Sequence, residues 1–381
     1  MKTVLAPRSP GCAVVLALLL LVIGFIVGNG YHTRQESPPS DGVRARKAAA
    51  LPPLVKGLRA SPDDRMLAFT GVYDRSQYAA RFVLDLHTGK FSVADSPAGW
   101  QDYITQWSPD SRSILFEREK IPHPVDDATP GIYEERVQPG DATPKRAEPQ
   151  LVTKGLAPNG EKVIAGLRAP DGKLLVRTRP DSKSLYEVHG GNIRLIDRAA
   201  ANYLQIRPVR EKNKTVYYVV RDVPGQREAV ALYRVQDGKA RRLSDVWQDV
   251  IWVYLAENVR WMIVCRQAEN GNDWAWTLYQ VAPAGIRLVK SASVPGDVNS
   301  VYWSPDLKYI LGSGGRSLWI IPIPSLQVHR LGTRQDWNAD DAAWLSRRNL
   351  VIVAAGGKLW EVTVPAGTQR ELWKFPPKYW R

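Results

Sequence analysis

The residues best suited to metal chemistry form one short acidic cluster near the C-terminal end of the chain. Asp336, Asn338, Asp340 and Asp341 offer oxygen ligands at alternating positions, as the first half of a calcium-binding loop does. The cluster lacks the glycine and the distant glutamate that complete such a loop. We therefore favour a polar turn between two strands, in which the aspartates cap backbone amides, and keep a metal site as the alternative. Beyond this candidate metal site we predict no cofactor and no catalytic residue.

Signatures of the common catalytic and phosphate-binding sites are missing from the sequence. It contains no G-x-S-x-G nucleophile elbow and no H-E-x-x-H zinc motif. Gly-Lys pairs begin at Gly89, Gly172, Gly238 and Gly357, but Ser or Thr never follows, so we interpret them as hairpin turns. The 5 histidines and 2 cysteines lack the short spacing of a zinc site. The sequence therefore favours a protein that is not an enzyme.

The net charge of the chain is strongly positive. Its 381 residues include 52 Lys and Arg against 38 Asp and Glu, a formal charge of +14 that is spread along the sequence. A diffuse positive surface favours anionic partners. We therefore predict a protein partner or an anionic cell-envelope polymer, and do not expect nucleic acid. The alternative is a basic surface that is only solvated.

The N-terminal segment is predicted to cross a membrane. The stretch Gly11–Gly28 has no charged residue and, at about 18 residues, reaches the lower limit for a spanning helix. Lys2 and Arg8 precede it, so the positive-inside rule keeps residues 1–10 in the cytoplasm and exports the remainder. We predict an uncleaved signal-anchor helix over residues 11–30. A cleaved secretory signal is the alternative, although the residues after the apolar run make a poor cleavage site.

The segments that flank the main domain differ from it in composition. Residues 31–53 are polar and rich in Pro, Ser and Ala, which is typical of a flexible stalk. They would join the membrane helix to a domain over residues 54–375, outside the cytoplasm in the periplasm or at the cell surface. Residues 376–381 form a basic, aromatic tail. We expect this tail to dock on the domain, with an anionic surface as the alternative contact.

One pattern recurs along the domain and predicts its fold. In the stretch Val301–Ile323 an apolar run ends at Trp303, a Ser-Pro-Asp turn follows, and two more apolar runs come after it. Proline presets φ for the turn, and aspartate bonds the amides just beyond it. Short runs rich in Ile, Tyr and Trp are typical of strands. The unit is therefore strand, turn, strand, loop, strand.

The unit repeats about every 40 residues, which is the length of one four-stranded propeller blade. The fourth, fifth and seventh copies have lost the Ser-Pro-Asp triplet but keep the apolar runs. We predict an all-β propeller of about seven four-stranded blades, with six or eight as alternatives, preceded by one transmembrane helix. The copies contain Leu58, Thr105, Gly166, Val216, Ile251, Val301 and Ala342 at or near their first strands.

Tryptophans occupy equivalent places ahead of three of the turns. Trp107, Trp303 and Trp344 each lie in the first strand of a copy. We expect them to pack between blades. The alternative is a stacking platform for sugar rings at the centre of the ring.

The repeats resemble a known family. Ser61-Pro62-Asp63, Trp107-Ser108-Pro109-Asp110, Ala169-Pro170-Asp171-Gly172-Lys173 and Trp303-Ser304-Pro305-Asp306 are similar to the S-P-D-G-[KR] core of TolB-type repeats, which are related to WD-repeat propellers. The resemblance covers most of the domain and implies a propeller. It does not imply one function, since such repeats occur in binding proteins, sensor ectodomains and peptidase accessory domains. The sequence departs from the family at Leu307, where glycine is usual.

The function predicted from the sequence is a membrane-anchored, extracytoplasmic scaffold that binds a protein or a polymer without catalysis. The first alternative is a propeller enzyme, of the lyase or glycoside hydrolase type, whose carboxylates converge in the central channel. The second alternative is a sensory ectodomain that passes ligand binding through the membrane helix.

Overall fold

The computed structural model describes one domain of the chain. It covers residues 54–376 with several internal gaps. The predicted membrane helix, the stalk and residues 377–381 lie outside the described residues. The internal gaps are residues 74–77, 121–129, 141–143, 154–162, 179–183, 190–191, 199–202, 227, 315–316 and 332–338.

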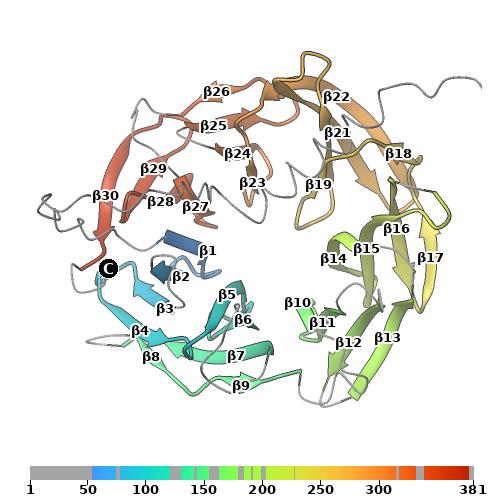
Figure 1. Ribbon diagram of the computed structural model, residues 1–381. Helices are drawn as coiled ribbons and strands as arrows, with labels where there is room; N and C mark the ends of the chain where they lie inside the picture. The colour runs from blue at the N-terminus through green and yellow to red at the C-terminus, as the bar shows by residue number, and fades with distance from the viewer. Residues whose placement is uncertain are drawn as a thin grey trace, which may run out of the picture. The chain divides into compact units, whose positions relative to one another are not determined.

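The described residues form seven antiparallel sheets that follow one another along the chain and are arranged as a ring (Figure 1). Each sheet comes from one contiguous segment and is a blade of a propeller, numbered here from 1 to 7 in chain order. The prediction of an all-β propeller is confirmed, with seven blades. In the part of the chain that the structure describes, no helix is long and apolar enough to cross a membrane.

The strands of the first four blades have the following bounds. Blade 1 consists of β1 (Leu54–Ala60), β2 (Met66–Tyr73), β3 (Tyr78–Asp85) and β4 (Phe91–Asp95). Blade 2 consists of β5 (Trp100–Trp107), β6 (Ser113–Lys120), β7 (Gly131–Gln138) and β8 (Lys145–Arg146), with β9 (Gln150–Leu151) also paired to β7. Blade 3 consists of β10 (Val163–Arg168), β11 (Leu174–Thr178), β12 (Ser184–His189) and β13 (Asn192–Arg198). Blade 4 consists of β14 (Tyr203–Glu211), β15 (Lys214–Asp222), β16 (Ala229–Gln236) and β17 (Lys239–Arg242), with β18 (Trp247–Gln248) paired to β16.

The last three blades have four strands each. Blade 5 consists of β19 (Trp252–Leu255), β20 (Trp261–Gln267), β21 (Asp273–Ala282) and β22 (Gly285–Pro295). Blade 6 consists of β23 (Ser300–Trp303), β24 (Tyr309–Gly314), β25 (Ser317–Pro322) and β26 (His329–Arg330). Blade 7 consists of β27 (Ala339–Trp344), β28 (Leu350–Ala355), β29 (Lys358–Thr363) and β30 (Gln369–Lys374).

The Ser-Pro-Asp turn joins the first two strands of a blade through a fixed set of hydrogen bonds. In blade 6, Ser304 Oγ donates to Asp306 Oδ1 over 2.8 Å and accepts the Tyr309 N–H over 2.9 Å. Asp306 also accepts the Lys308 N–H over 3.0 Å. The same bonds occur around Ser61 and Ser108 in blades 1 and 2. In these three blades the sequence signature thus fixes where the first strand ends and the second begins.

Apolar side chains fill each of the seven interfaces between successive blades. Between blades 1 and 2, Met66 and Val83 pack against Ile104 and Phe116. Equivalent clusters lie between each of the six remaining pairs of neighbouring blades, including blades 7 and 1. Burial of both faces of a sheet in this way requires a closed ring of blades.

Three of the tryptophans singled out in the sequence pack between blades, as predicted. Trp107 is buried between blades 1 and 2, and its indole N–H donates to the Arg59 carbonyl over 3.0 Å. Trp344 of blade 7 makes the equivalent contact to blade 6, where its indole N–H donates to the Tyr302 carbonyl over 2.9 Å. Trp303 lies half-buried against the cluster between blades 5 and 6.

The ring closes between blades 7 and 1 without a shared strand. Asp341 on β27 is the polar centre of this closure. Its carboxylate accepts the Leu58 N–H of blade 1 over 2.9 Å, the Tyr302 hydroxyl of blade 6 over 2.7 Å and its neighbour's N–H, that of Ala342, over 2.8 Å. Burial, followed by the charge of Asp341, raises the pKa of Tyr302, so this phenol stays a donor.

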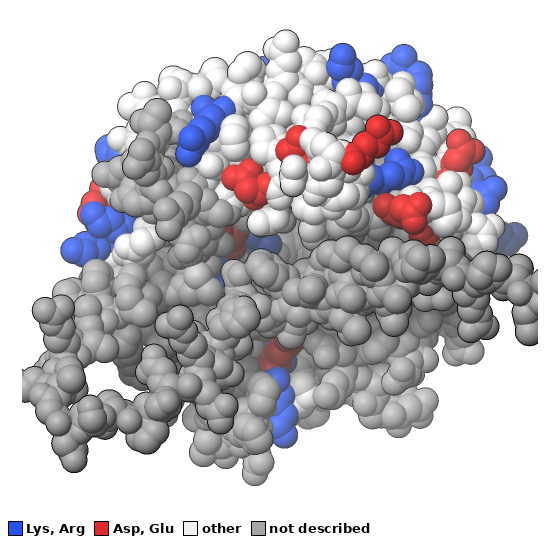
Figure 2. All heavy atoms as spheres, turned by 45° about the horizontal axis from the view of Figure 1, so that its top comes forward, with Lys and Arg blue, Asp and Glu red and all other residues white. Residues whose placement is uncertain are grey.

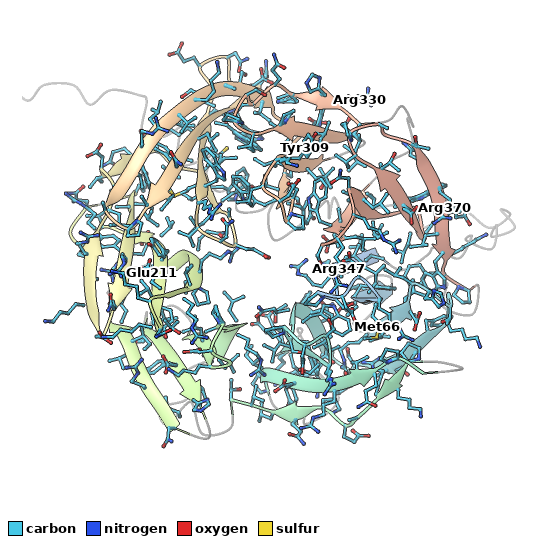
Figure 3. The ribbon with its side chains drawn as sticks, turned by 180° about the vertical axis from the view of Figure 1, so that it is seen from behind. Met66, Glu211, Tyr309, Arg330, Arg347 and Arg370 are labelled. Carbon is cyan, nitrogen blue, oxygen red and sulfur yellow. The ribbon has the colours of Figure 1, made fainter. Side chains whose placement is uncertain are left out.

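Two further contacts support the closure. Arg347, in the first turn of blade 7, lies beside blade 1 (Figure 3). Its backbone N–H donates to the Asp64 carboxylate over 2.6 Å. Phe375, which directly follows β30, is fully buried against the rings of Phe69 and Phe82 in blade 1. Trp373 packs on the same rings. The aromatic residues at the end of blade 7 therefore dock on blade 1.

Removal of the Asp341 carboxylate should weaken the closure of the ring. Asp341→Ala leaves the Leu58 N–H and the Tyr302 hydroxyl buried without an acceptor. We expect the free energy of unfolding to fall by about 2–4 kcal/mol. Urea unfolding of residues 50–381, followed by tryptophan fluorescence, measures the change. Glu371→Gln, which removes an exposed ion pair with Lys358, is the control and should leave the stability unchanged; an equal loss in both variants would contradict the role assigned to Asp341.

The departure from the repeat at Leu307 should cost stability. Leu307 has a φ of 58°, in the left-handed region that favours glycine, whereas blade 3 has Gly172 with a φ of 83° at the matching position. We expect Leu307→Gly to raise the free energy of unfolding by about 0.5–1 kcal/mol, because a leucine in this conformation is strained. Gly172→Ala is the reciprocal control and should lower it, since the added Cβ meets nothing within 4 Å and only the backbone conformation is penalised. Urea unfolding of both variants tests the pair, and opposite signs are required.

Candidate functional site

The structure contains a polar pocket between blades 2 and 3. Its volume is about 480 Å³. It lies at the Ser-Pro-Asp turn of blade 2, beside the outer half of that blade and the end of β10 in blade 3. The lining residues are Ser108, Pro109, Asp110, Arg112, Ser113, Glu134, Arg136, Gln138 and Arg168.

Strand β7 supplies one wall of the pocket because its side chains alternate between two neighbours. Glu134, Arg136 and Gln138 face the pocket. The intervening Glu135 and Val137 are buried toward blade 1. A single strand therefore presents polar groups to one interface and fills the other.

The two carboxylates of the pocket are already bound by other lining residues. Glu134 accepts the Ser113 hydroxyl over 2.6 Å and pairs with Arg168 Nη2 at 2.7 Å. Asp110 accepts the Ser108 hydroxyl over 2.6 Å. This bond is the main reason why the pKa of Asp110 is lowered. A carboxylate with a lowered pKa is a poor general base, so the arrangement does not activate Ser108 as a nucleophile.

The cations of the pocket are less fully used than its carboxylates. Among the described residues, no carboxylate lies within ion-pair distance of the Arg112 or Arg136 guanidinium. Both side chains are exposed. The Nε atom of Arg168 is buried and has no hydrogen-bond partner in the described part of the chain. Three guanidiniums thus surround a polar cavity, which suits a carboxylate, phosphate or sulfate group.

A buried ionic network lies behind the pocket and fixes the position of blade 2. Asp102 on β5 binds Arg81 of blade 1 and also Arg118 of its own blade, the latter at 2.7 Å. Arg81 continues to Glu135 at 3.2 Å, and Glu135 also binds Arg146. Burial lowers the pKa of Arg81, while the charges of Asp102 and Glu135 act in the opposite direction. Since Glu135 neighbours two pocket residues, this network holds their strand in place.

The acidic cluster, for which the sequence favours a polar turn over a metal site, is only partly described. Asp336 and Asn338 lie outside the described residues, as does the side chain of Asp340. Asp341 lies in the closure of the ring, with its carboxylate engaged by three donors. Among the described residues, no group of three or more His, Cys, Asp or Glu side chains could hold a metal ion. The cluster as a whole therefore stays a prediction.

Sequence analysis did not find the pocket. Arg112 and Asp110 belong to the turn signature, but nothing in the sequence places Arg168 of blade 3 beside Glu134 of blade 2. The only available signal was the basic residue that ends the turn, and it is shared by several blades.

Comparison with known proteins supports the fold. No family model matches the chain, and no curated protein matches it. Among similar solved structures, hydrazine synthase of Kuenenia stuttgartiensis has a TM-score of 0.55 at 12% identity, covering 85% of this chain and 100% of that chain. A functionally unknown protein from Desulfotomaculum acetoxidans DSM 771 has a TM-score of 0.51 at 10% identity, covering 80% of this chain and 94% of that chain. Dihydro-heme d1 dehydrogenase NirN in complex with DHE has a TM-score of 0.51 at 13% identity, covering 84% of this chain and 67% of that chain.

At such low identities the solved structures show a shared fold alone. The resemblance to TolB-type repeats stays a prediction, because no matching family bears on it. The residues of the site are therefore the basis for any function proposed for this chain.

The network behind the pocket should depend strongly on Asp102. We expect Asp102→Asn to lower the free energy of unfolding by about 3–5 kcal/mol, because Arg81 and Arg118 then share a buried site without their common counter-charge. Thermal and urea unfolding measure the loss. Asp237→Asn, in an exposed pair with Lys214, is the control and should change little. A small effect of Asp102→Asn would show that the arginines are satisfied without it.

Proposed function

We propose that the protein is a binding module in which a rigid seven-bladed ring recognises an anionic group of a protein or of a cell-envelope polymer. The proposal rests chiefly on one observation. In the pocket, the exposed Arg112 and Arg136 have no ion-pair partner among the described residues, while Arg168 and both carboxylates are already bound. The ring supplies stiffness, since each blade is held on both sides by its neighbours. Stiffness limits the entropy lost on binding.

The charges of the pocket favour recognition over acid–base catalysis. Asp110 and Glu134 each accept a serine hydroxyl at 2.6 Å. Bound carboxylates of this kind position side chains, and the exposed guanidiniums are free to meet a ligand. A planar guanidinium binds a carboxylate or phosphate through two parallel hydrogen bonds, which gives direction as well as affinity.

The cellular setting belongs to the same proposal. Residues 11–30 would hold the ring at a membrane, with residues 31–53 as a stalk and the ring outside the cytoplasm. A ring tethered in this way meets polymers of the envelope at a high effective concentration. The sensory and enzymatic alternatives stay open predictions, and no contact described above favours either of them.

Charge reversal in the pocket tests the proposal. Residues 50–381 form a suitable protein, because the strands that close the ring all lie between Leu54 and Lys374. Polyglycerol phosphate and a polyglutamate peptide serve as anionic probes. We expect Arg112→Glu combined with Arg136→Glu to weaken probe binding by about 10-fold or more at moderate salt, since attraction becomes repulsion. Isothermal titration calorimetry measures the affinity.

A matched control separates the pocket from the general positive charge. Arg330→Glu combined with Arg370→Glu changes the net charge equally on the outer strands of blades 6 and 7. This control should bind like the unmodified protein. Equal weakening in both double variants, or no binding of either probe by the unmodified protein, would overturn the assignment of the pocket.

A further inference from the structure

The outer strands of blades 3, 4 and 5 carry an unusual concentration of exposed cations. These strands, β13, β17 and β22, occupy neighbouring places on one side of the ring (Figure 1). All four residues of β17 are exposed, and three of them are basic. We call these strands the basic rim; its exposed cations are Arg194, Lys239, Arg241, Arg242, Arg287 and Lys290.

Little negative charge balances the basic rim. Asp197 is the one carboxylate on its three strands, and it pairs with Arg221 of β15. Arg194 pairs with Glu187 at 2.9 Å. Within the described part of the chain, no carboxylate lies within ion-pair distance of the rim cations on β17 and β22.

Other parts of the surface differ from the basic rim. On β30, Arg370 pairs with Glu361 at 3.0 Å, and Lys358 of the neighbouring strand pairs with Glu371 at 2.6 Å. The part of the ring at the top of Figure 1, which includes blade 6, comes forward in Figure 2 and shows Lys and Arg interspersed with Asp and Glu. Protection of sheet edges against pairing with other chains would call for cations on every outer strand. Such protection does not explain why the five exposed cations of β17 and β22 have no carboxylate of the described residues within ion-pair distance.

Large apolar side chains are exposed within the same rim. Ile193 is 41% exposed, Leu195 is 40% exposed and Leu288 is 58% exposed. They account for all but one of the exposed large apolar side chains in the described residues, the other being Leu54. Each of them is next to a rim arginine in sequence, so the apolar side chain and the arginine point to opposite faces of the same outer strand.

Contacts between blades 4 and 5 make the rim continuous across these two blades. The Arg241 guanidinium donates to the carbonyl of Pro283, in the turn before β22. A Cβ on Gly285 would lie 3.5 Å from the Leu243 carbonyl, which directly follows β17. The cations of β17 and β22 therefore belong to one surface.

We propose that the basic rim docks on the surface of an anionic lipid bilayer. Cations attract the headgroups, while Ile193, Leu195 and Leu288 enter the headgroup region without needing a shaped partner. Charge complementarity favours this occupant, and scattered apolar side chains among cations suit a fluid surface better than a packed protein interface, whose core is contiguous and depleted of charge. Docking would place the ring edge-on at the membrane. The inference goes beyond the proposed function and does not require the pocket.

Vesicle binding of residues 50–381 tests the inference, since this segment lacks the predicted membrane helix. The probes are vesicles of phosphatidylcholine alone and vesicles with about one third phosphatidylglycerol. We expect binding to the anionic vesicles only, weakened by added salt. Lys239→Glu, Arg241→Glu and Arg242→Glu together should weaken it by about 100-fold or more. Leu288→Ser with Ile193→Ser, at constant charge, should weaken it by about 5-fold or more.

Two controls with preserved folding decide between the rim and the overall charge. Arg330→Glu, Arg370→Glu and Lys374→Glu together reverse three cations on the outer strands of blades 6 and 7, and this variant should keep vesicle binding. The pocket variant, Arg112→Glu with Arg136→Glu, should also keep vesicle binding. The two proposals can therefore fail independently, because the pocket variant is expected to affect binding of the anionic probes only. Circular dichroism checks that each variant is folded.

Three results would overturn the inference. The first is the absence of binding to anionic vesicles. The second is an equal loss in the rim variant and in the control on blades 6 and 7, which would reduce the effect to net charge. The third is rim-dependent binding to polyglycerol phosphate without binding to vesicles, which would assign the rim to a polymer partner instead.

Discussion

The packing of each blade against its neighbours is the constraint on which this structure depends. A single four-stranded sheet cannot bury both faces, and here every face is covered by an apolar cluster shared with the next blade. Only a closed ring satisfies all seven sheets. The closure between blades 7 and 1 is the most demanding place, because no strand crosses it. Apolar packing and hydrogen bonds to side chains join sheets from opposite ends of the domain there.

Polar groups at the interfaces also help to determine which blades lie side by side. Asp341 accepts donors from blades 6 and 1, and Asp102 binds arginines from blades 1 and 2. A buried charge without a partner is costly, so such contacts disfavour any other arrangement of the blades. Because buried arginines need a counter-charge, carboxylates such as Asp102 are buried as their partners. The buried acids hold blades together, while many cations stay at the surface, where the proposed anionic partners would bind.

The blades differ in their surface residues, and the proposed binding surfaces arise from these differences. Seven similar blades would offer seven similar surfaces, yet a guanidinium-lined pocket is found between blades 2 and 3, and the basic rim belongs to blades 3, 4 and 5. The basic rim depends on residues outside the repeat signature, and the pocket adds Arg136 and Arg168 to turn residues such as Arg112. The turn residues that define the repeat are structural, since the side chains of Ser304 and Asp306 form their hydrogen bonds within the turn itself. Residues that the fold does not require are therefore the ones free to bind.

The sequence by itself determined the class of fold, the repeat and most of the strands, because strand propensity and turn chemistry are local properties. It missed β14, where Pro208 weakens the strand signal; the structure tolerates that proline because β14 is the innermost edge strand of its blade and bonds a partner on one side only. It also missed β22, whose exposed outer position gives it a polar sequence. Only the tertiary structure decided the blade count, the pairing of Asp341 with Tyr302 and Leu58, and the meeting of Arg168 with Glu134. These contacts join residues far apart in the chain, and their geometry follows from ring closure, which no local pattern of residues encodes.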